Sequence, residues 1–163
     1  MKKAMLICAL ALVTCAPAWA GHPSSFEAVM KNYEPIRLAL LEDSTKGVAE
    51  HGRALVSDLK ALQAEFSHER VGASHEAMMV VKEKLPGMIA SAEVLAKAES
   101  LEAARSAFYD LSVPLVRWRE GVTGEGRPSV AYCSMHKKSW LQPGSKIGNP
   151  YGGMPGCGTI VSK

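Results

Sequence analysis

Two short clusters near the carboxyl end of the chain contain the residues best suited to chemistry. The first contains Cys133, Met135 and His136, and the second contains Met154 and Cys157. Thiolates and thioethers are soft ligands that favour Cu(I) or Ag(I), whereas zinc prefers cysteine and histidine. The residue types therefore predict a soft-metal site. Its ligands would be Cys133, Met135, Met154 and Cys157, with His136 as an optional addition.

The spacing within each cluster is compatible with such a site. In a strand, residues two apart point to the same side, so Cys133 and Met135 would face one way and His136 would project away from Met135. Met154 and Cys157 are separated by Pro155-Gly156, and a tight turn there would bring their sulfurs to one side. Each cluster would then contribute one thiolate and one thioether.

A disulfide between the same two cysteines is the second interpretation. Exported proteins commonly join their cysteines, and closing this 24-residue interval would stabilise the fold by about 3 to 4 kcal/mol on the chain-entropy model. Met135 and Met154 would then fill apolar gaps, and no metal would bind. The two states can also alternate, since a reduced pair binds metal and an oxidised pair does not.

The amino-terminal sequence predicts export. Two lysines precede an apolar stretch over residues 4–14, and the motif Ala18-Trp19-Ala20 fits the small-x-small rule of signal peptidase. We expect residues 1–20 to be a cleaved signal peptide and the mature protein to be periplasmic. The first two of the four cysteines leave with this peptide, so the mature chain keeps Cys133 and Cys157.

Charge and hydropathy narrow the possible partners. The leader removes two of the 19 basic residues, so 17 remain against 16 acidic ones and the mature formal charge is +1. Nucleic acids and anionic membranes require concentrated positive charge, and we expect neither as a partner. We also expect no membrane span, because no later stretch has the roughly 20 apolar residues that a span requires.

The distribution of glycine divides the mature chain near residue 121. Nine of the 14 glycines lie from Gly121 onward, whereas residues 22–120 contain four. Before this point apolar residues recur at helical spacing over residues 26–41, 48–66, 78–95 and 101–118. We therefore predict a mainly α fold, with an antiparallel four-helix bundle over residues 21–120.

Local signals indicate where these helices begin. Ser24 with Glu27 matches a capping box, and Asp43, Ser74 and Ser100 stand at the expected starts of the next three helices. The polar stretch 67–73 is expected to be a connection, and Pro86 is expected to split the third helix.

Residues 121–163 are predicted to form a small irregular or β-containing tail that packs on the bundle. Strands are expected over 130–135 and 158–161, with a turn at 142–145 between them. Large aromatic side chains are expected to anchor this tail. They are Trp118, Tyr132, Trp140 and Tyr151.

The tail motifs resemble a family of bacterial periplasmic domains of unknown function. The resemblance rests on Tyr132-Cys133-x-Met135, Trp140-Leu141, Asn149-Pro150-Tyr151-x-Gly153 and Met154-x-x-Cys157-Gly158. That family ends in Y-C-P-M, W-L, N-P-Y-x-G and M-x-x-C-G blocks and is often encoded beside, or fused to, membrane-fusion subunits of CusB-type heavy-metal efflux systems. The resemblance implies a helical amino-terminal part, a copper-related role and such a subunit as partner.

The chain departs from the family pattern in two places, because Ser134 replaces the usual proline and Gly152-Gly153 replaces a bulkier pair. The run Cys133-Ser134-Met135-His136 is also similar to the C-P-M-H core of small heavy-metal-binding domains attached to copper pumps. This second resemblance supports His136 as a ligand.

No enzyme signature is found in the sequence. It lacks a Gly-rich phosphate loop, a C-x-x-C-H haem motif, an H-E-x-x-H helix and a G-x-S-x-G elbow. We therefore expect a non-enzymatic protein. The ligand types together with the resemblance predict that it binds Cu(I) or Ag(I) in the periplasm, and the resemblance implies that it sequesters the metal or delivers it to an efflux system. The alternative is a disulfide-stabilised interaction module without metal.

Overall fold

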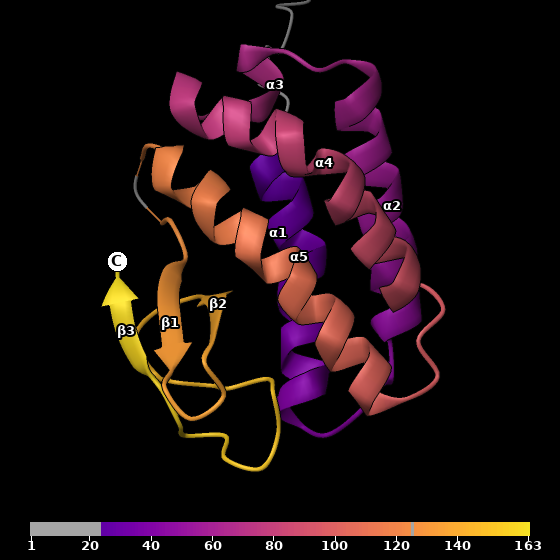
Figure 1. The fold of residues 1–163 in the computed structure, drawn as a ribbon, viewed down its shortest axis with the longest axis vertical. Helices are drawn as coiled ribbons and strands as arrows, with labels where there is room; N and C mark the ends of the chain where they lie inside the picture. Colours follow the sequence, from indigo (N-terminus) through magenta and orange to yellow (C-terminus); the bar gives the residue numbers. More distant parts are fainter. Residues whose placement is uncertain (1–23, 125) are drawn as a thin grey trace, which may run out of the picture.

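The computed structural model describes residues 24–124 and 126–163, and the predicted signal peptide lies outside these residues. The described chain forms five helices followed by three strands (Figure 1). The helices are α1 (Ser25–Leu41), α2 (Val48–Ala64), α3 (His68–Val71), α4 (His75–Leu95) and α5 (Leu101–Gly121). The strands are β1 (Ser129–Cys133), β2 (Lys138–Gln142) and β3 (Thr159–Ser162). The mainly helical character and the small C-terminal sheet are confirmed, whereas a regular four-helix bundle is not.

Side-chain caps define the starts of most helices. The Ser24 Oγ accepts the Glu27 N–H at 3.3 Å, and the Glu27 carboxylate accepts the Ser24 N–H at 3.0 Å, which confirms the predicted capping box. Ser74 and Ser100 cap α4 and α5 in the same way, through N–H groups of the first turn. Each cap satisfies a backbone donor that the helix itself leaves without a partner.

Three local predictions were wrong. The second helix begins at Val48 instead of near Asp43, because Asp43 has a left-handed backbone with φ of 52° and its carboxylate pairs with Arg105. The connection over 67–73 contains the short helix α3. Helix α4 continues through Pro86, where Leu85 and Met88 lie in the core and hold the helix in place despite the missing N–H.

Apolar side chains from all of the helices form one core that extends into the sheet. Helix α4 packs against α2 and α5, and α1 packs against α2. At Gly52 on α2 an added Cβ would lie 2.5 Å from the backbone nitrogen of Ala96, just after α4. The missing side chain therefore allows the two helices to approach closely.

The three strands form an antiparallel sheet in the order β2-β1-β3. The sheet lies beside α1 and α5, with β2 nearest the helices and β3 at the outer edge (Figure 1). Strand β1 ends at Cys133, so Met135 lies beyond it, and β2 is a strand that the sequence analysis did not predict. Among the described residues, none of the helices has the length and apolar character that crossing a bilayer demands.

Candidate functional site

The hairpin between β1 and β2 positions Cys133 and His136. Cys133 is the last residue of β1 and pairs in register with Lys138, the first residue of β2. The four residues between them form a tight turn, which Lys137 closes with a φ of 53°. Because this segment is a turn, the side-to-side alternation expected for a strand does not apply, and His136 folds back towards Cys133.

The long segment between β2 and β3 brings Cys157 to the same place. The backbone of Asn149 donates to the Pro155 carbonyl at 2.9 Å, and the Cys157 N–H donates to the Met154 carbonyl at 3.0 Å. These bonds fold the segment back on itself at Gly152, whose φ of 87° favours glycine. Cys157 therefore reaches the end of β1 from a distant part of the sequence.

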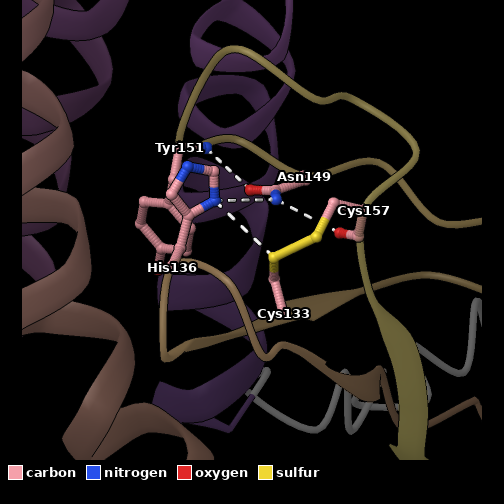
Figure 2. The surroundings of a disulfide bond; sticks show 5 residues. All are labelled: Cys133, His136, Asn149, Tyr151 and Cys157. Atoms are coloured by element: carbon pink, nitrogen blue, oxygen red, sulfur yellow. Dashed lines mark hydrogen bonds between the residues drawn. A yellow bond between two sulfur atoms is a disulfide. The ribbon is translucent and has the colours of Figure 1, made fainter.

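Cys133 and Cys157 form a disulfide, with their Cα atoms 5.7 Å apart (Figure 2). Cys133 has no exposed surface, whereas Cys157 is half-buried. The two cysteines are thus joined in this state, as the second interpretation of the sequence expected. The disulfide ties the hairpin to the segment that leads into β3.

His136 lies against this disulfide. Its Nδ1 atom is 3.6 Å from Cys133 Sγ and 3.3 Å from the side-chain nitrogen of Asn149 (Figure 2). Asn149 is 1% exposed, and its side chain also contacts Tyr151 and Cys157. The half-buried histidine therefore belongs to a polar cluster around the buried Asn149, although the strand-based prediction had directed it away from Met135.

The two methionines are placed differently from the histidine. Met135 is 68% exposed, in the turn after β1. Met154 is half-buried, and its backbone carbonyl accepts the bond from Cys157. Of the five predicted ligands, the structure joins Cys133 to Cys157 and places His136 against Cys133.

Within residues 24–124 and 126–163, no set of three or more His, Cys, Asp or Glu side chains is grouped to hold a metal ion in the disulfide state. A disulfide sulfur lacks the thiolate charge on which a cysteine ligand depends. Any soft-metal site at this position therefore requires the two cysteines to be reduced.

Aromatic side chains enclose the site on the side of the helices. Tyr151 is at the centre of this group, with its ring centroid 6.0 Å from that of Trp140 and 6.4 Å from that of His136. The Lys138 ammonium lies 4.9 Å from the Tyr151 ring centroid and 5.1 Å from that of Tyr109, as cation–π contacts. Burial raises the pKa of Tyr151 well above its ordinary value.

Trp140 is buried, as the sequence analysis expected of the tail aromatics, whereas Tyr132, expected to be another anchor, is exposed. The Trp140 side chain is fully buried, and its indole N–H donates to the Gln142 side-chain oxygen at 2.8 Å. That oxygen also accepts the Gly148 N–H at 3.2 Å. Trp140 and Gln142 therefore connect β2 to the segment that carries Asn149.

Three side chains from the helices join the site to the rest of the molecule. The Tyr33 hydroxyl accepts the Leu141 N–H at 3.2 Å, Arg37 donates to the Gly148 carbonyl at 2.7 Å, and Arg105 donates to the Pro150 carbonyl at 2.9 Å. The sequence analysis did not identify these residues or Asn149 as parts of the site. Asn149 stood in a family motif, but no spacing rule indicated its partners, which depend on the path of the loop.

Comparisons of this chain with protein-family models, with curated proteins and with solved structures find no match. The resemblance to the periplasmic family thus remains a prediction from the tail motifs.

Proposed function

We propose that the protein binds Cu(I) or Ag(I) when Cys133 and Cys157 are reduced, and that His136 supplies a third ligand. The observation that carries this proposal is the 3.6 Å contact between His136 Nδ1 and Cys133 Sγ beside a second sulfur. Two thiolates and an imidazole form a donor set that suits a soft monovalent ion. Met135 and Met154 lie on the same two chain segments and are proposed as secondary thioether ligands.

The disulfide makes this function dependent on redox state. Reduction by a dithiol or phosphine adds two electrons and two protons to the sulfur pair, and the reductant is oxidised. Binding of Cu(I) then displaces the thiol protons, because the thiolate is the ligand form. The oxidised protein holds no thiolate and should not bind the ion at this position.

The proposed setting is the periplasm, with the protein sequestering the metal or passing it to the membrane-fusion subunit of a heavy-metal efflux system. This part of the proposal rests on the leader sequence and on the family resemblance. Cell fractionation of the full-length chain, with mass spectrometry of its mature amino terminus, tests the location and the cleavage after Ala20.

A competition assay tests the metal site. Protein reduced with a phosphine and desalted without oxygen is titrated against a chromogenic Cu(I) chelator, in parallel with the disulfide form. We expect the dithiol form to withdraw Cu(I) from the chelator, and we expect the disulfide form and Cys133→Ser to leave it bound. No withdrawal by folded dithiol protein would overturn the proposal.

Variants of the other predicted ligands rank their contributions. His136→Gln should weaken Cu(I) binding more than Met135→Leu or Met154→Leu, because only the histidine already lies against a cysteine sulfur. Leucine preserves the volume of methionine and removes only the sulfur. Equal losses in all three variants would argue for a site in which the methionines are primary ligands.

The second candidate function is a disulfide-stabilised interaction module that holds no metal. The burial of Cys133 and the connection of the disulfide to two segments of the tail favour it. This candidate predicts that the disulfide resists mild reduction in the folded protein and that no variant above alters metal retention. Thiol labelling of protein purified from the periplasm distinguishes the two candidates.

A further inference from the structure

We infer that Asn149 is a positioning residue that holds the His136 ring with a proton on Nε2 and an unprotonated Nδ1, which accepts the Asn149 side-chain N–H and lies 3.6 Å from Cys133 Sγ. The tautomer assignment requires no metal and concerns the disulfide state. The use of His136 as a third ligand rests on the proposed function.

Two main-chain partners determine the orientation of the Asn149 side-chain amide. One terminal atom faces the Tyr151 N–H at 2.9 Å, which is a donor, so this atom must be the amide oxygen. The other faces the Cys157 carbonyl oxygen at 3.1 Å, which is an acceptor, so it must be the amide nitrogen. Both contacts agree on one orientation, and the burial of Asn149 keeps solvent from offering alternatives.

The orientation of the Asn149 amide determines the tautomer of His136. An amide nitrogen carries two hydrogens and has no acceptor capacity, so it can only donate. One hydrogen goes to the Cys157 carbonyl, and the other is directed at His136 Nδ1, 3.3 Å away. His136 Nδ1 must therefore be the unprotonated nitrogen, and the proton of the neutral ring is on Nε2.

A second asparagine–histidine pair in the molecule has the opposite arrangement. The Asn32 side-chain nitrogen donates to the Asp58 carboxylate at 3.0 Å, which places the Asn32 oxygen against His51 Nδ1 at 3.1 Å. An amide oxygen can only accept, so His51 must carry a proton on Nδ1. The two histidines thus have opposite predicted tautomers, and His51 is an internal reference for His136.

The tautomer of His136 determines which of its ring nitrogens can bind a metal. A histidine ligand coordinates through an unprotonated nitrogen, and its neighbours determine which nitrogen that is. Asn149 keeps unprotonated the nitrogen that lies 3.6 Å from Cys133 Sγ, and in the disulfide state the Asn149 N–H occupies the single lone pair of that nitrogen. In the reduced protein a metal ion held by the two thiolates would take this lone pair in place of the Asn149 N–H. Asn149 thereby selects Nδ1 as the histidine nitrogen of a two-sulfur, one-nitrogen site.

Nitrogen-15 NMR of the imidazole rings tests the tautomer in the metal-free disulfide protein, at a pH at which the histidines are neutral. We expect the His136 ring to show a protonated Nε2 and an unprotonated Nδ1, and the His51 ring to show a protonated Nδ1. A protonated Nδ1 in His136 would overturn the inference, even if the reduced protein binds Cu(I). The measurement uses the unaltered protein, so it does not depend on whether a variant folds.

Two matched variants test the role of Asn149. Asn149→Ala should allow the His136 ring to populate both tautomers while His51 is unchanged, and Asn32→Ala should have the reverse effect. In the reduced protein Asn149→Ala should change the Cu(I) affinity by less than about tenfold, because the loss of the fixed tautomer and the absence of a hydrogen bond to break act in opposite directions, and Asn32→Ala should leave it unchanged. A His136 ring that keeps a single tautomer in Asn149→Ala would contradict the positioning role. If neither the unaltered protein nor the variants bind Cu(I) but the tautomers are as predicted, the metal function fails and the tautomer assignment stands.

Discussion

The helical part, residues 24–121, and the C-terminal unit, residues 126–163, are stabilised in different ways. The helices bury apolar side chains such as Leu59, Leu111 and Trp118 along most of their length. The strands of the C-terminal unit have only four or five residues each. Besides the side chains that it adds to the shared core, this unit depends on a disulfide and on buried polar bonds through Gln142 and Asn149. The stability of the C-terminal unit should therefore respond to redox conditions, whereas that of the helical part should not.

Removing the disulfide should have the largest effect, and it should separate the two regions. Replacing both cysteines by alanine should lower the free energy of unfolding of the C-terminal unit by about 3 to 4 kcal/mol, since the open chain regains the entropy of a 24-residue loop. Amide hydrogen exchange measures this region by region. We expect Val130 and Leu141 to lose protection while the core amides of α2 and α4 keep theirs. Equal loss in both regions would show that they unfold as one unit.

A steric change between two helices should destabilise the helical part without involving the disulfide. Gly52→Ala should destabilise the protein by about 1 to 3 kcal/mol, because the new methyl group would lie 2.5 Å from the Ala96 nitrogen and α2 would have to move away from α4. Gly87→Ala is the control, since nothing lies within 4 Å of its added Cβ and alanine should stabilise α4 by about 0.5 to 1 kcal/mol. Urea denaturation of both variants measures the difference. An unchanged free energy of unfolding in Gly52→Ala would refute the close approach of these helices.

A change at the junction should weaken the link between the regions. Tyr33→Phe leaves the buried Leu141 N–H without its acceptor and removes the 2.7 Å bond to Ser112, which should cost about 1 to 3 kcal/mol. Thermal and urea unfolding measure the loss. Ser112→Ala is the companion variant, because it removes one partner of Tyr33 and keeps the bond to β2. A loss in Ser112→Ala as large as that in Tyr33→Phe would show that the bond to β2 contributes little.

Alkaline pH should produce the most gradual effect. Burial raises the pKa of Tyr33 and of Tyr151 in the folded protein, whereas an unfolded tyrosine ionises near pH 10. Above that pH the unfolded state holds fewer protons, so the free energy of unfolding falls as pH rises, by at most about 1.4 kcal/mol per pH unit for each tyrosine. The stabilisation from the two buried neutral tyrosines is therefore fully present below pH 10 and decreases as pH rises above it. Unfolding measured from pH 9 to 11 should show this slope, and Tyr33→Phe should reduce it.

The sequence was most informative where structure depends on neighbouring residues. Helical spacing and the serine caps at Ser24, Ser74 and Ser100 predicted the first, fourth and fifth helices, because both signals act within one or two turns. Strand β2 was missed because a five-residue strand owes its existence to its partner, and nothing in Lys138–Gln142 alone distinguishes it from a loop.

The site shows the same limit. The ligand chemistry of cysteine and the predicted export of the chain suggested that Cys133 and Cys157 are either metal ligands or a disulfide. Only the folded structure joins them. The place of His136 depends on a turn that begins at Ser134, one residue after the strand ends. The role of Asn149 depends on a loop that returns to β1 from eight residues before Cys157. Such placements result from the whole chain path, and residue spacing does not encode them.

The arginine contacts between the helices and the tail imply a pattern of substitution among related chains. Arg37 and Arg105 donate to the main-chain carbonyls of residues 148 and 150, which every residue offers, so these two bonds do not themselves require particular side chains there. Space is limiting instead, since an added Cβ at Gly148 would lie 2.7 Å from Arg37 and one at Gly152 would lie 2.8 Å from Arg105. Each arginine should therefore covary with its glycine, and a homologue with a bulkier residue at position 152 should carry a shorter side chain at position 105.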